Sequence, residues 1–255
     1  MTKVRELQQK RGWAWSTVVV IVKPTLLAAT RHDWIDGEKI PATGGCVVAV
    51  NHISHLDPMT LGWFLYEHGR LVRYLAKDAL FRTPLLKYIV KDAGQIPVRR
   101  MTEGAASAFD AAVEAIHQGE LIGIYPEGTI TKDPDGWPMR GKTGAARIAL
   151  ATGCPVIPVG QWGAQDILPA YTFRPHVFPR RTASYKVGDP VDLDDLRDQP
   201  LTEDVLRQAT DRIMAAITGL VEDLRGETAP AVRFDPRTSG VNEIGNPKKQ
   251  KRGEA

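Results

Sequence analysis

The residues best suited to chemistry lie in three short segments, each directly after an apolar run: residues 51–58, 94–100 and 125–129. The first segment holds His52 and Asp57, the second ends in Arg99 and Arg100, and the third holds Glu127. If the apolar runs are parallel strands, their carboxyl ends meet at one edge of a sheet. A histidine, a carboxylate and two guanidiniums at one edge indicate base-catalysed chemistry on an anionic substrate.

His52 and Asp57 are five residues apart, and Asp57 precedes Pro58, which is a signal for the start of a helix. One interpretation is structural: Asp57 caps the helix and His52 only ends a strand. The other is catalytic: the turn folds Asp57 back onto the imidazole, fixes its tautomer and stabilises the imidazolium. The two roles do not exclude each other, so the sequence leaves both open.

The segment around Glu127 predicts a tight turn, because Pro126 ends the strand and Gly128 allows a close backbone approach. The structural interpretation is that this segment is only a surface turn. The functional one is that Glu127 hydrogen-bonds a substrate hydroxyl, while the amides of Gly128 and Thr129 face a developing oxyanion.

Two other kinds of site are not favoured. His52 and His55 stand three apart, but no further cluster completes a metal shell, so no metal site is predicted. Ser54 lacks the Gly-x-Ser-x-Gly turn of a hydrolase nucleophile.

The elements that must position these groups alternate between strand and helix. Strands are expected over residues 46–50, 71–75, 95–98, 121–125, 155–159 and 185–187, and helices over 58–67, 85–90, 103–117, 143–151 and about 206–224. This order predicts an α/β domain with a mostly parallel or mixed sheet flanked by helices.

The 255 residues and 43% hydrophobic composition suit one domain with a substantial core. The net charge of +3 gives no support for nucleic-acid binding, but basic residues gather at both ends, where they could contact an anionic membrane surface. Two cysteines in apolar runs fit a reducing cytoplasm.

The N-terminal stretch, residues 13–29, is apolar, begins with Trp13 and Trp15, and is interrupted at Lys23. It is short for a bilayer-spanning helix, which needs about 20 apolar residues. A basic flank with tryptophans favours an interfacial helix, and a terminal helix docked on the core is the alternative. We therefore expect a membrane-associated segment over residues 1–30, the main domain over 31–225, and a polar, basic, disordered tail over 226–255.

Taken together, the motifs resemble those of the lysophosphatidate acyltransferase (PlsC-like) family of glycerolipid acyltransferases. Four motifs occur in the family's order: Asn51, His52 and Asp57; residues 94–100, ending at Arg100; residues 125–129; and residues 156–159. The family usually has arginine where this chain has Ile130, and often an acidic residue where it has Arg99.

The resemblance implies a 1-acylglycerol-3-phosphate O-acyltransferase. In that reaction His52, oriented by Asp57, deprotonates the free hydroxyl of a lysophospholipid, which attacks a fatty acyl thioester and gives phosphatidic acid. Arg99, Arg100 and Lys142 would bind the acceptor phosphate. No cofactor is implied, and the co-substrate is acyl-CoA or the acyl form of acyl carrier protein. The expected location is the cytoplasmic face of the cell membrane, in monotopic or peripheral attachment.

Three alternatives stay open. The same chemistry could act on another lysophospholipid or glycolipid, because the motifs report chemistry more than acceptor identity. A thioester hydrolase would pass the acyl group to water. A membrane-peripheral lipid-binding protein would use the His52 and Asp57 pair only as a structural cap.

Overall fold

The computed structural model describes residues 5–84, 86–98, 104–172 and 174–242. The strands are β1 (Thr30–Ile35), β2 (Cys46–Val50), β3 (Val72–Lys77), β4 (Ile96–Val98), β5 (Leu121–Ile124), β6 (Val156–Trp162) and β7 (Arg181–Val187). The helices are α1 (Trp13–Thr17), α2 (Lys23–Ala29), α3 (Asp57–Glu67), α4 (Asp78–Arg82), α5 (Leu86–Asp92), α6 (Gly104–His117), α7 (Gly144–Thr152), α8 (Ala164–Ile167), α9 (Asp194–Arg197) and α10 (Glu203–Arg225).

Within these residues the seven strands form a single sheet in the order β1-β7-β6-β2-β5-β3-β4. All neighbouring strands are parallel except β6 and β7, which are antiparallel. The predicted α/β class with a mostly parallel, mixed sheet is therefore confirmed. The strand β1 was not predicted from the sequence.

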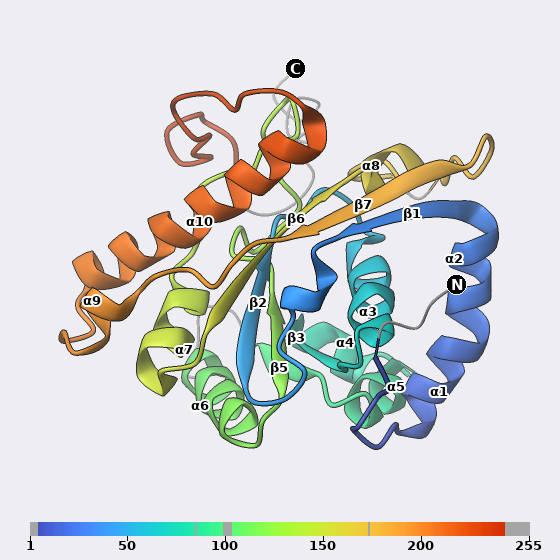
Figure 1. The fold of residues 1–255 in the computed structure, drawn as a ribbon, viewed down its shortest axis with the longest axis horizontal. Coiled ribbons are helices and arrows are strands. Elements are labelled where there is room, and N and C mark those ends of the chain that lie inside the picture. The colour runs from blue at the N-terminus through green and yellow to red at the C-terminus, as the bar shows by residue number, and fades with distance from the viewer. Residues whose placement is uncertain (1–4, 85, 99–103, 173, 243–255) are drawn as a thin grey trace.

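The central strand β2 shows how the sheet is buried on both faces. Alternate residues of a strand point to opposite faces, so Val47 and Ala49 pack with α6, α7 and α10, while Val48 and Val50 pack on the side of α3. All four side chains are fully buried. Figure 1 shows the two helical layers, α6, α7 and α10 on one face and α1 to α5 on the other. The carboxyl ends of β2 and β5 lie side by side, because the two strands pair in parallel.

The N-terminal stretch from Trp13 to Ala29 is one continuous helical run, with a π-helical turn at Val18–Val22 between α1 and α2. It docks on α5, since the Ala14 amide donates to the Asp92 carboxylate at 2.7 Å. Among the described residues, no helix combines the length and apolarity needed to cross a bilayer.

The expected disorder after residue 225 is wrong for residues 226–242, which pack back on the domain. The Arg140 amide donates to the Phe234 carbonyl at 2.9 Å, and the Arg140 guanidinium pairs with Asp235 at 2.6 Å. Arg233 lies 3.7 Å from Asp211 on α10. Specific polar contacts therefore order a segment whose composition alone gave no sign of a core.

Candidate active site

His52 follows β2 directly, and its ring is fixed by Asp57 at the start of α3. The His52 Nδ1 atom lies 2.7 Å from Asp57 Oδ2. The Asp57 side chain is fully buried, whereas that of His52 is 16% exposed. A carboxylate accepts only, so Nδ1–H donates to Asp57 and Nε2 keeps its lone pair for a proton. The geometry of a histidine base with an orienting carboxylate is present.

Asp57 holds this position through the loop before it. Its Oδ2 atom also accepts from the amides of Ile53 at 2.7 Å and Ser54 at 2.9 Å. The predicted cap role is wrong, because these donors precede α3 and no amide of the first helical turn binds the side chain. Within the described residues, Asp57 Oδ1 is buried without a hydrogen-bond partner. The hydrogen bonds of the Asp57 carboxylate to described residues are therefore all with the His52 loop, whose conformation they fix.

The ring of Tyr125 covers one face of the imidazole. The two ring centroids are 4.2 Å apart and the planes are inclined by 26°, which is a stacked arrangement. Tyr125 follows β5, the parallel neighbour of β2, so sheet pairing brings the two rings together. In the sequence this tyrosine is only one position of a motif, and the spacing of the motif does not predict the contact.

Glu127 is placed beside the pair but turns its carboxylate inward. Oε1 accepts from the His52 amide at 2.9 Å, and Oε2 accepts from the Met139 amide at 3.1 Å. The side chain is 1% exposed. Burial raises the pKa of Glu127 to about 8, against the lowering effect of the two amide bonds. The predicted bond from Glu127 to a substrate hydroxyl is therefore replaced by a role in positioning the His52 backbone.

Of the two amides predicted to face an oxyanion, those of Gly128 and Thr129, the turn after Glu127 leaves only one free to do so within the described residues. The Gly128 amide donates to the Tyr125 carbonyl at 2.9 Å, and Gly128 has a φ of +72°, which favours glycine. In the described part of the chain, the amides of Thr129 and Ile130 are engaged by no backbone or side-chain acceptor. The Thr129 amide thus remains a candidate oxyanion donor, whereas the Gly128 amide closes the turn.

Of the three cations predicted to bind a phosphate, the structure describes only Lys142. Arg99 and Arg100 lie outside the described residues. Lys142 is exposed and lies next to the turn: a Cβ built on Gly128 would be 3.5 Å from its Nζ atom. Ile130, at the position where the family usually has arginine, is 2% exposed and supplies no charge.

A buried polar network that no sequence motif predicts lies under the His52 loop. Asn51 and Gln161 exchange bonds between the ends of β2 and β6: Asn51 Nδ2 donates to the Gln161 carbonyl at 3.0 Å, and the Gln161 amide donates to Asn51 Oδ1 at 2.8 Å. The Tyr185 hydroxyl donates to Gln161 Oε1 at 2.7 Å and contacts Thr60 Oγ1 at 2.6 Å. Thr60 Oγ1 also lies 3.2 Å from the Asp57 carbonyl oxygen, so the network reaches the His52 and Asp57 pair. No local motif could indicate it, since its members come from four elements.

The family model described as Acyltransferase matches residues 34–162, half of the chain, and this range includes His52, Asp57 and Glu127. The chain belongs to the acyltransferase family.

Two bacterial relatives and one solved structure extend this result. The chain is 34% identical over 134 residues to the 1-acyl-sn-glycerol-3-phosphate acyltransferase of Borreliella burgdorferi, covering 52% of each protein. It is 31% identical over 126 residues to the enzyme of that name from Bacillus subtilis, covering 49% of this chain and 60% of the relative. It thus spans about half the length of such curated relatives. The structure of the 1-acyl-sn-glycerophosphate acyltransferase PlsC from Thermotoga maritima shares the fold, with a TM-score of 0.63, 23% identity, and coverage of 84% of this chain and 81% of that one.

Proposed function

We propose that this protein transfers a fatty acyl group from an acyl thioester to the free hydroxyl of 1-acyl-sn-glycerol 3-phosphate, which gives phosphatidic acid. The observation that carries the proposal is the bond from His52 Nδ1 to the buried Asp57 carboxylate at 2.7 Å, which orients the ring and leaves Nε2 as the base. Membership of the acyltransferase family and the names of the relatives support the reaction and the acceptor.

The proposed reaction is a direct transfer. His52 Nε2 takes the proton of the acceptor hydroxyl, and the oxygen attacks the thioester carbonyl carbon to form a tetrahedral intermediate. The amide of Thr129 is the donor that we assign to the oxyanion. The carbon–sulfur bond then breaks, and the thiolate leaves without a strong acid because its pKa is far below that of an alcohol. The imidazolium returns its proton to the thiolate or to water.

Binding of the acceptor is assigned to cations near the turn. Lys142 beside Gly128, together with Arg99 and Arg100, would hold the phosphate of the acceptor. No cofactor takes part in this scheme, and the donor is acyl-CoA or an acylated carrier protein. Another lysophospholipid acceptor would use the same His52 chemistry.

We further propose that the helical run at the N-terminus and α5 contact the cytoplasmic face of the membrane. Trp13, Val20 and Ile21 are 54%, 72% and 60% exposed, and Tyr88 on α5 is 58% exposed. Trp13 and Tyr88 line the same apolar depression. Exposed aromatic and aliphatic side chains next to basic residues suit the interfacial region of a bilayer, where the acceptor resides.

The experiment is acyl transfer from radiolabelled oleoyl-CoA to lysophosphatidate and to other lysolipids, in detergent, with the wild type and the His52→Ala variant. Phosphatidate formed by the wild type and lost in the variant supports the proposal. Product with a different lysolipid alone would overturn the acceptor assignment and retain the chemistry. Free fatty acid in place of any acylated product would indicate a hydrolase, and no turnover at all, with lipid binding kept by His52→Ala, would indicate a binding protein.

A further inference from the structure

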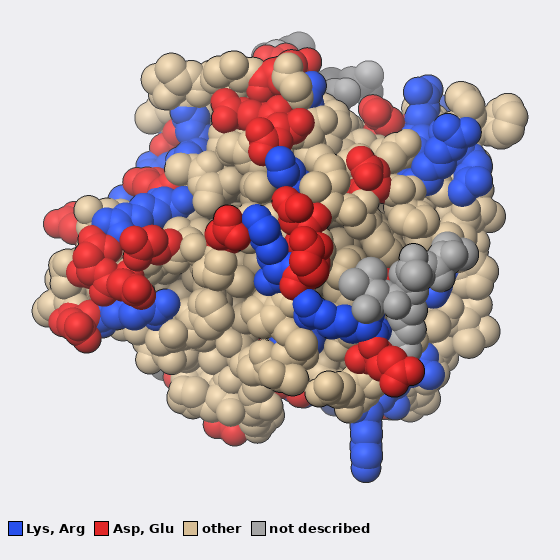
Figure 2. All heavy atoms as spheres, in the orientation of Figure 1, with Lys and Arg blue, Asp and Glu red and all other residues tan. Residues whose placement is uncertain are grey.

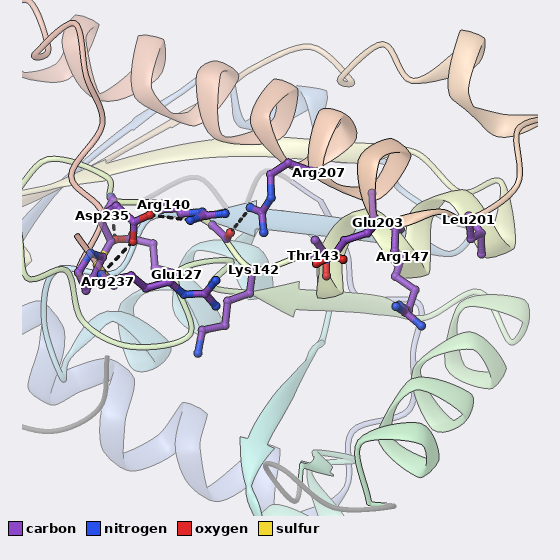
Figure 3. A pocket seen from close by; sticks show the side chains of 14 residues that line it. Glu127, Arg140, Lys142, Thr143, Arg147, Leu201, Glu203, Arg207, Asp235 and Arg237 are labelled. Atoms are coloured by element: carbon purple, nitrogen blue, oxygen red, sulfur yellow. Dashed lines mark hydrogen bonds and ion pairs between the residues drawn. The ribbon is translucent and has the colours of Figure 1, made fainter. Parts of the chain in front are cut away.

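A cleft of about 420 Å³ opens beside the Glu127 turn, on the side of α7 and α10 (Figure 3). Its walls come from residues 139–147, from α10 with Leu201 before it, and from residues 235–237. The cationic side chains in this lining are Arg140, Lys142, Arg147, Arg207 and Arg237, and the carboxylates are Glu127, Glu203 and Asp235. The lining therefore carries an excess of positive charge. Figure 2 shows positive and negative side chains mixed over the face that it displays. The excess of positive charge in the cleft is therefore not a general feature of that face.

The cleft cations are held in different ways. Arg140 is paired with Asp235 at 2.6 Å, which neutralises it in part. Arg207 Nη1 donates to the Gly141 carbonyl at 2.8 Å, which fixes the guanidinium without cancelling its charge. Arg147 is exposed and, among the described residues, forms no ion pair. In Figure 3 Arg147 and Lys142 both extend away from α10.

The phosphate of the proposed acceptor accounts for only one end of this cleft. In 1-acyl-sn-glycerol 3-phosphate the phosphate is attached to the carbon next to the one that carries the reacting hydroxyl. It must therefore lie close to His52, and Lys142 beside the turn is the cleft cation placed there. Arg147 lies at the opposite end of the cleft from Glu127 (Figure 3). The acceptor phosphate, placed at Lys142, leaves the charge of Arg147 unassigned, and Arg207 lies between these two cations with its guanidinium on the Gly141 carbonyl.

We propose that the part of the cleft between Arg207 and Arg147 binds the phosphate groups of a nucleotide-bearing acyl thioester. The inference rests on the proposed function, because it assigns a subsite for the acyl donor of that reaction. Arginine forks match phosphate oxygens in pairs, and the cleft begins at the Glu127 turn that holds the His52 amide. A donor whose phosphates lie between Arg207 and Arg147 would extend its long, flexible thioester arm toward His52.

The shape of the site favours a nucleotide over the surface of a carrier protein. Pockets for small molecules and cofactors typically measure about 300–1,000 Å³, and this cleft falls in that range. A carrier protein would need a broad complementary face of about 800 Å² on each partner. A concave site with Arg147 at its far end and Arg207 nearer the Glu127 turn is suited to a compact polyanion.

The test compares two donors, oleoyl-CoA and the phosphate-free thioester of oleate with N-acetylcysteamine. The variants are Arg147→Gln, which disturbs no described ion pair, and the double variant Arg147→Gln with Arg207→Gln. The matched control is Arg212→Gln, the same change on α10 at an arginine that pairs with Asp195 outside the cleft. Binding of free CoA, measured by calorimetry, gives a readout that does not need turnover.

We expect the double variant to raise KM for oleoyl-CoA by about tenfold or more, and Arg147→Gln to raise it several-fold, because each loses a charge-assisted contact. Binding of free CoA should weaken by a similar factor. The KM for the phosphate-free donor and the KM for lysophosphatidate should be unaffected in both variants. The Arg212→Gln control should match the wild type in every measurement.

Equal losses of activity with both donors, or a raised KM for lysophosphatidate alone, would each overturn the inference. Wild-type protein that acylates no lysolipid from either donor would instead defeat the proposed function. Calorimetry with free CoA would still decide whether the cleft binds nucleotide phosphates.

Discussion

Glu127 supports His52 through the backbone, since its Oε1 atom accepts from the His52 amide at 2.9 Å while its other oxygen accepts from the Met139 amide. One buried carboxylate thus joins the His52 loop after β2 to the loop that leads into the basic cleft. A shift in either loop would be transmitted to the other through two hydrogen bonds.

The first prediction concerns the orientation of the base. Asp57→Asn should lower kcat by about 10²–10⁴-fold, because the amide no longer fixes the Nδ1–H tautomer or stabilises the imidazolium. Turnover of oleoyl-CoA with lysophosphatidate measures the loss, and circular dichroism checks that the variant is folded. A folded Asp57→Asn protein with wild-type kcat would show that the contact is structural only.

The second prediction uses the titration of Glu127. Its pKa is raised to about 8 in the folded protein, compared with 4.5 for an ordinary glutamate. The stabilisation from the protonated form is complete below about pH 4.5 and is lost as the pH rises to about 8, at up to about 1.4 kcal/mol per pH unit. The Glu127→Gln variant has no group that titrates at this position. Its side chain has only one oxygen to accept from the amides of His52 and Met139, so one of these two hydrogen bonds is lost.

The free energy of unfolding of Glu127→Gln should therefore lie below that of the wild type at pH 5, and the gap should narrow toward pH 8. Urea denaturation at several pH values measures both curves. Parallel curves for the two proteins would contradict a raised pKa at this position.

A third prediction concerns the buried network under the active-site loop. Tyr185→Phe removes the hydroxyl that contacts Thr60 and Gln161, which leaves two buried polar groups without that partner. The free energy of unfolding should fall by about 1–3 kcal/mol. We expect kcat to fall with KM unchanged, because the network reaches the Asp57 carbonyl through Thr60. Tyr88→Phe on α5 is the control, since Tyr88 is 58% exposed, and an equal effect there would refute a special role for Tyr185.

The fourth prediction tests contact with the membrane. Val20→Asp in the N-terminal helical run should weaken binding to anionic phospholipid vesicles at least about tenfold, because burial of a valine contributes about 1.5–3 kcal/mol. Turnover in detergent should be unchanged. Val232→Asp is a matched control, since the two valines are 72% and 83% exposed. Equal loss of vesicle binding in both variants would indicate a general charge effect and not an insertion site.

Much of the core of the fold was predictable, because β2 and its neighbours are unbroken apolar runs that only a doubly covered sheet can bury. The strand β1 was not, since Thr30–Ile35 is rich in polar residues and pairs with β7 about 150 residues further along the chain. Its strand character depends on that partner and not on its own pattern.

The candidate site shows the same division. The contact between His52 and Asp57 lies within one turn, so their spacing indicated it. The inward direction of the Glu127 carboxylate depends on Met139, and the stack of Tyr125 on His52 depends on the pairing of β5 with β2. Contacts across elements such as these leave no local pattern in the sequence.

The segment after α10 has a practical consequence for anyone who shortens or tags this protein. Composition suggests cutting the chain at residue 226, yet Asp235 and Arg237 line the basic cleft and Asp235 holds Arg140 in place. A boundary at the end of α10 would remove one wall of that cleft. A shortened protein of this kind that still folds would misreport what the proposed cleft binds.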